Sequence, residues 1–109
     1  MNLDEMPAVR HRIKYRNENL YVVVVLNDAG QPYEIFAEHA TRGDYKIQYM
    51  LASWDCLTRF ISTALQILPL SETIKHLERS TRQAGDLPAI ILNILSKYQT
   101  SDEDKNITL

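Results

Sequence analysis

Cysteine is nearly missing from this chain of 109 residues, since Cys56 is the only one. A single cysteine excludes an internal disulfide, a Cys-X-X-Cys redox pair and a zinc site built from several thiolates. The three histidines, His11, His39 and His76, also lack the spacing of metal ligands. We therefore expect neither a metal ion nor a cofactor.

Long apolar runs are missing too. The longest, LYVVVVL at residues 20–26, is far too short to cross a bilayer, and no targeting segment precedes it. A formal net charge of -2 argues against a binder of nucleic-acid polymers, whose affinity comes from many surface cations. These absences predict a cytoplasmic protein that binds neither membranes nor nucleic acids, and any anion site must be local.

Three segments have the pattern of strands, namely residues 8–16, 20–26 and 32–40. Residues 17–19 form a short polar connection, and residues 27–31 supply the Asn, Asp and Gly of a hairpin loop. The simplest arrangement is an antiparallel meander. Its middle strand contains four consecutive valines, so neither of its faces is polar. Helices can cover one face, which leaves the other face for something else to cover.

A helical period begins near residue 48, with an apolar stripe at Met50, Trp54, Leu57, Ile61, Ala64 and Leu68 and with Asp55, Thr58, Arg59 and Ser62 off it. A shorter helix over 70–77 and a polar loop over 79–85 follow. Asp86 is placed to cap a third helix, in which the early Pro88 needs no intrahelical donor.

The predicted fold is therefore α+β, with a three-stranded antiparallel sheet packed against one long and two shorter helices. We expect one domain over residues 8–99. Residues 1–7 are predicted to be a flexible leader, and residues 100–109 a flexible acidic tail.

Four cations alternate with other residues in AVRHRIKYR, and on a strand they would point to one face: Arg10, Arg12, Lys14 and Arg16. One interpretation is a solvated edge strand that resists aggregation. The other is that these cations, with Arg59, Arg79 or Arg82, collect at a subunit boundary and hold phosphate groups.

Three further features are candidate parts of a ligand site. The loop at residues 78–86 places two arginines ahead of a helix N-terminus, which favours an anion, although any helix connection can have this composition. Glu34 and Glu38 share a strand face without a recognisable catalytic motif, so they are better suited to pair with cations or sugar hydroxyls. Tyr33 and Phe36 could stack on a base, although most aromatic residues of so small a domain belong to the core.

The order of these elements, with the segments LYVVVVLNDAGQPYEIFAEHA, LTRFISTALQ, PLSETIKHLE and DLPAIILNIL, resembles the TSCPD domain. That domain occurs at the C-terminal end of adenosylcobalamin-dependent ribonucleotide reductases and in free-standing small proteins. The likeness covers roughly Val9 to Tyr98 and includes Glu34, Phe36 and Arg59, but most matching positions define the fold. With Cys56 alone, the chain cannot be a reductase or its dithiol shuttle.

A fainter likeness concerns the phage Thoeris anti-defence 1 proteins, which oligomerise and sequester cyclic nucleotide-derived immune signals without cleaving them. This likeness implies a homo-oligomer whose basic strand faces enclose phosphates, in the host cytoplasm if a phage encodes the chain.

We expect a non-catalytic nucleotide-binding protein. The candidate ligand residues are Arg10, Arg12, Tyr33, Glu34, Phe36, Arg59, Arg79 and Arg82. The alternative is a TSCPD-type accessory module that docks on a ribonucleotide reductase or another nucleotide-metabolism protein; an enzyme would be considered only if Glu34 and Glu38 flanked a cleft.

Overall fold

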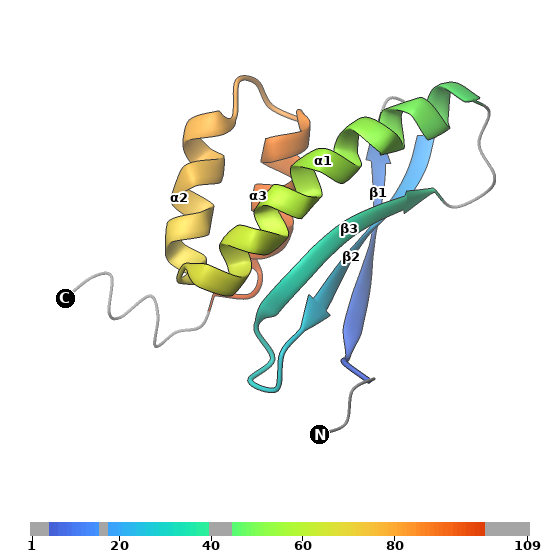
Figure 1. The fold of residues 1–109 in the computed structure, drawn as a ribbon. Helices are drawn as coiled ribbons and strands as arrows, with labels where there is room; N and C mark the ends of the chain where they lie inside the picture. Colours follow the sequence, from blue (N-terminus) through green and yellow to red (C-terminus); the bar gives the residue numbers. More distant parts are fainter. Residues whose placement is uncertain (1–4, 16–17, 40–44, 100–109) are drawn as a thin grey trace. The chain divides into compact units, whose positions relative to one another are not determined.

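The computed structural model describes residues 5–15, 18–39 and 45–99. Within these ranges, three strands are followed by three helices, as Figure 1 shows. The elements are β1 (Ala8–Tyr15), β2 (Glu18–Leu26), β3 (Pro32–His39), α1 (Tyr45–Ile67), α2 (Leu70–Ser80) and α3 (Leu87–Ser96). The predicted α+β class is confirmed, and none of the described helices is long and apolar enough to cross a bilayer.

The three strands form one antiparallel sheet in the order β1-β2-β3. The ladder between β1 and β2 continues to the pair Tyr15 and Glu18, so β2 begins two residues before the predicted position. The connection predicted over residues 17–19 was therefore too long, because Glu18 and Asn19 pair with β1 despite their polar character.

The connection from β2 to β3 has the predicted hairpin chemistry. The Asn27 side chain accepts hydrogen bonds from the backbone N–H groups of Ala29 and Gln31, at 2.9 and 3.0 Å. Gly30 has a φ of 77°, which costs glycine little because it has no Cβ. This turn fixes the start of β3 at Pro32.

Side chains alternate between the two faces of the sheet. One face carries the apolar side chains Leu20, Val22, Val24 and Ile35, which are almost completely buried. The other face, called the open face below, carries the cations of β1, because Arg10 pairs with Val23 and Arg12 with Tyr21. Arg10, Arg12 and Lys14 therefore point to one face as predicted, whereas Arg16 lies outside the described residues.

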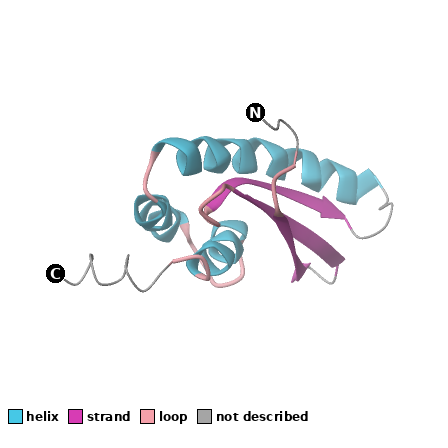
Figure 2. Cartoon of the chain, turned by 90° about the horizontal axis from the view of Figure 1, so that it is seen from below, coloured by secondary structure: helices cyan, strands magenta, loops and turns pink. Residues whose placement is uncertain are grey.

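Helix α1 packs on the buried face, and Figure 2 shows it running along the sheet. The Trp54 ring meets the Tyr15 ring of β1 edge-on, with centroids 5.0 Å apart. Further along the helix, Ser62 bonds to the backbone of β3. These contacts fix the path of α1 from β1 toward the outer edge of β3.

The buried side of α1 differs from the predicted stripe. Trp54 and Ile61 are buried as expected, but Thr58 and Ser62, which were predicted to lie off the stripe, are only 2% and 9% exposed. Their hydroxyls donate to the backbone oxygens of Asp55 and Ile35, which offsets the cost of burying them. Leu68 lies beyond the helix end, and the side chain of Met50 lies outside the described part of the chain.

The chain divides into two compact units, Met1–Gln66 and Ile67–Leu109, and the second contains α2 and α3. Helix α2 buries Ile74 and Leu77 and ends at Ser80, so Arg79 lies in its last turn and not in the predicted loop. No glycine or proline stops the helix there; Thr81 ends it in an extended conformation. The predicted cap of α3 is confirmed, since Asp86 accepts a hydrogen bond from Ala89 N at 3.0 Å.

Candidate functional site

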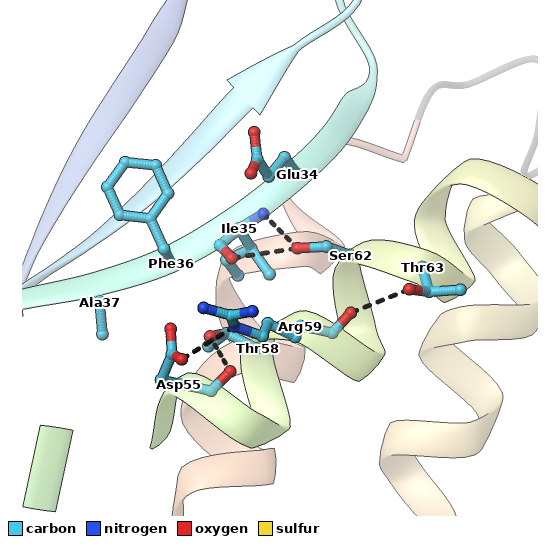
Figure 3. A pocket seen from close by; sticks show the side chains of 9 residues that line it. All are labelled: Glu34, Ile35, Phe36, Ala37, Asp55, Thr58, Arg59, Ser62 and Thr63. Atoms are coloured by element: carbon cyan, nitrogen blue, oxygen red, sulfur yellow. Dashed lines mark hydrogen bonds and ion pairs between the residues drawn. The ribbon is translucent and has the colours of Figure 1, made fainter. Parts of the chain in front are cut away.

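An open cavity of about 670 Å³ lies where α1 passes the outer edge of β3, as Figure 3 shows. Four consecutive residues of β3 and five of α1 line it: Glu34, Ile35, Phe36, Ala37, Asp55, Thr58, Arg59, Ser62 and Thr63. Three of the eight predicted ligand residues, Glu34, Phe36 and Arg59, are thus brought together. They come from two consecutive elements, with Glu34 and Phe36 on β3 and Arg59 on α1.

Arg59 is the cation of this cavity. Its Nε donates to Oδ2 of Asp55 at 2.8 Å, one helical turn earlier, and its side chain is mostly exposed. The contact uses only Nε, so the two terminal amino groups of the guanidinium have no partner among the described residues. Asp55 therefore holds the arginine in place, while the part that can bind an anion in a bidentate manner stays available.

Glu34 and Phe36 border the cavity from β3. Both belong to the open face, where Glu34 pairs with Val25 and Phe36 pairs with Val23. Phe36 is 36% exposed, so an aromatic surface is available beside a carboxylate that has no ion pair among the described residues. Tyr33 is not among the lining residues; its carbonyl accepts a hydrogen bond from Nε2 of Gln66 at 3.3 Å.

Arg10 and Arg12 lie on the open face of β1. Nη2 of Arg10 donates to Oε2 of Glu38 at 3.0 Å, and its guanidinium carbon lies 4.0 Å above the centroid of the Tyr21 ring. Arg10 is thus held by an anion and an aromatic face within its own sheet. Glu38 is not among the residues that line the cavity, so the two carboxylates of β3 do not flank it together.

Arg79 and Arg82 belong to the second unit. Both are exposed, Arg79 at the end of α2 and Arg82 between α2 and α3. The backbone N–H groups of Arg82 and Gln83 donate to Oδ2 of Asp86, at 2.9 and 3.1 Å. These bonds and that from Ala89 lower the pKa of Asp86 below its ordinary value, Arg82 contributing most. A carboxylate therefore already takes the donors that were predicted to attract an anion ligand.

Sequence analysis missed several lining residues, including Asp55, Thr58 and Thr63. The spacing of Asp55 and Arg59 by four residues is a usable signal for their ion pair. The contribution of Thr58 and Ser62 carries no such signal, because their burial depends on where α1 crosses β3. Among the described residues, no three His, Cys, Asp or Glu side chains gather where they could hold a metal ion.

The outer side of α1 has a second, smaller hollow of about 240 Å³, lined by Cys56, Arg59, Phe60 and Thr63. Phe60 is 71% exposed, which is unusual for a phenyl group on a helix. Cys56 is exposed beside it. This hollow shares Arg59 and Thr63 with the larger cavity, but its lining includes no carboxylate among the described residues.

Comparisons with protein-family models, with curated proteins and with solved structures find no match for this chain. The likeness to the TSCPD domain and the fainter likeness to anti-defence proteins therefore stay expectations, and the site is defined by its geometry alone.

Proposed function

We propose that this chain is a non-catalytic, oligomeric protein of the cytoplasm that captures a phosphate-bearing nucleotide in the cavity between β3 and α1. The observation that carries the proposal is that Arg59, Phe36 and Glu34 line the same cavity. Its volume of about 670 Å³ falls within the range of roughly 300–1,000 Å³ that is typical of small-molecule sites.

Each of the three residues matches one part of a nucleotide. The free end of the Arg59 guanidinium suits a phosphate, and the ring of Phe36 offers a stacking surface for a base. The Glu34 carboxylate can accept hydrogen bonds from sugar hydroxyls or from base amino groups. Capture needs only these contacts, with no nucleophile and no metal ion.

The charges of the cavity narrow the class of ligand. Asp55 and Glu34 both line it, and Arg59 is the single cation of the lining among the described residues. A nucleoside triphosphate would bring several negative charges toward two carboxylates, which is unfavourable. A cyclic dinucleotide carries one negative charge on each of its phosphodiesters and fewer charges in all than ATP or dATP, so such a signal fits this lining better. The proposed role is sequestration of such a signal.

Calorimetry or a thermal-shift screen against cyclic dinucleotides, cyclic trinucleotides, cyclic ADP-ribose isomers and ATP or dATP tests this function. Binding to the folded state stabilises it by about 2.7 kcal/mol when the ligand is at 100 times its dissociation constant. Arg59→Gln should weaken binding tenfold or more, since a hydrogen bond to a charged group is worth about 1.5–3 kcal/mol. Lys97→Gln, which removes an exposed cation of the second unit, should bind as the wild type does.

The fate of the ligand separates capture from catalysis. Ligand recovered intact after denaturation of a loaded complex supports sequestration, and turnover products would contradict it. Absence of a shift with every nucleotide would favour the second candidate, an accessory module that docks on a protein such as a ribonucleotide reductase. The observation that favours this candidate is the exposed Phe60 beside its apolar hollow.

A further inference from the structure

The open face of the sheet has its charges sorted by strand. The strand registers give three columns of side chains: Arg10, Arg12 and Lys14 on β1; Tyr21, Val23 and Val25 on β2; Glu34, Phe36 and Glu38 on β3. Cations thus line one side, carboxylates line the other, and an apolar column separates them. Helix α1 packs on the opposite face, through Trp54 and Tyr15.

Part of this charge is unmatched within the ranges that the structure describes. Arg10 pairs with Glu38, but among the described residues Arg12, Lys14 and Glu34 take part in no ion pair. Val23, in the middle of the open face, is only 5% exposed and is therefore already shielded from solvent, whereas Phe36 beside it remains exposed. An apolar centre between charged margins is the usual composition of a protein interface.

Symmetry decides which partner fits this pattern. Two copies that stack face to face around a twofold axis can place that axis across the strands or along β2. An axis across the strands sets β1 on β1 and opposes cations with cations. An axis along β2 sets β1 of one copy on β3 of the other, which opposes Arg12 with Glu38 because both share the row of Tyr21.

We propose that the open face binds the open face of a second copy of this chain, with the twofold axis parallel to β2. The two sheets would pack about 10 Å apart, as aligned sheets do. Glu38 can accept hydrogen bonds from its own Arg10 and from the second copy's Arg12, since a carboxylate has two acceptor oxygens. Tyr21 and Val23 of each copy would lie at the centre, and Phe36 would face the second copy's Arg10, because both share the row of Val23.

This arrangement also bears on the cavity. It lays β1 of the second copy over β3, and Glu34 and Phe36 of β3 border the cavity. The second copy's Arg12 or Arg10 would then add positive charge at the mouth of a site that has one cation of its own. The contribution of the second copy to the cavity rests on the proposed function, whereas the dimer itself needs no nucleotide.

Sedimentation equilibrium of the full chain without any nucleotide tests the interface separately from ligand binding. The wild type should be a dimer. Arg12→Glu and Glu38→Arg should each raise the dimer dissociation constant roughly tenfold or more, because each sets like charges opposite one another. The double variant Arg12→Glu/Glu38→Arg restores opposite charges and should recover most of the affinity. Lys97→Glu makes the same change in charge at an exposed residue that belongs to none of the three strands and should leave the dimer intact.

Three results would overturn the proposal. A wild-type chain that is monomeric at its highest soluble concentration rules out the dimer. If neither single variant weakens the dimer, the dimer uses another surface. If both single variants weaken it and the double variant does not recover the affinity, the pairing of Arg12 with Glu38 is refuted. Circular dichroism of every variant separates these results from unfolding.

Discussion

Ser62 takes the place of a neighbouring strand at the outer edge of β3. Its hydroxyl accepts a hydrogen bond from Ile35 N at 2.9 Å and donates one to Ile35 O at 3.1 Å. Both backbone groups point away from β2, where an edge strand has no ladder partner. Ser62 itself is buried, and its single hydroxyl satisfies two backbone groups.

Ser62→Ala should lower the free energy of unfolding by about 1–3 kcal/mol, because it leaves a buried donor and a buried acceptor unpaired. Urea denaturation of the two proteins measures this loss. Thr63→Ala is the matched control, since the neighbouring Thr63 hydroxyl is exposed and donates only to Arg59 O within the helix. An equal loss of unfolding free energy in both variants would show that the contact between Ser62 and β3 adds no stability beyond that of an exposed hydroxyl.

At the scale of elements, the start of α3 depends on one carboxylate. Asp86 accepts from Ala89 N, a donor that a helix N-terminus otherwise leaves unpaired, and also from the N–H groups of Arg82 and Gln83 ahead of the helix. These bonds lower its pKa below the ordinary value of 3.8. The stabilisation is therefore complete above pH 3.8 and is lost as the pH falls through the lower pKa of the folded state.

Asp86→Asn should remove this dependence on pH, because the amide keeps an acceptor oxygen but cannot titrate. We expect the variant to be less stable than the wild type at about pH 6 and the difference to shrink toward about pH 3. Urea midpoints at the two pH values measure it. A difference that stayed constant with pH would mean that the charge of Asp86 does not contribute.

Two leucines of helix α3 differ in burial. Leu95 is fully buried, and Leu92, three residues earlier, is only partly buried. Leu95→Ala should cost about 2–5 kcal/mol of folding free energy, the range for a large-to-small change in a core. Leu92→Ala removes the same atoms and should cost clearly less in the same denaturation experiment; equal costs would contradict the assigned helix face.

The sequence was sufficient to predict the elements wherever a local signal exists. Alternation over residues 8–16, the Asn and Gly of the turn before Pro32 and the cap at Asp86 each report a short-range preference, and all agree with the structure as far as it describes these residues. The end of α2 was predicted wrongly because such a signal is absent there. Nothing between Leu77 and Ser80 breaks a helix, so α2 continues through Arg79.

At the scale of the whole molecule, only part of the site was predictable. The path of α1 decides that Arg59 reaches the cavity beside Glu34 and Phe36, and that path depends on contacts such as Tyr15 with Trp54, which are distant in the sequence. Residue type identified the arginines as candidate ligand residues, but it could not show which of them line the cavity. Arg79 and Arg82 belong to the second unit.

The bond between Ser62 and β3 has a consequence for aggregation. Four consecutive valines with high strand propensity are the kind of segment that enters cross-β fibrils when its neighbours are stripped away. Here they form the central strand; the hydroxyl of Ser62 and the amide of Gln66 occupy the edge of β3, and alternating cations on β1 discourage growth on the other side. The native sheet therefore protects both of its edge strands, and detachment of α1 would remove the protection at β3.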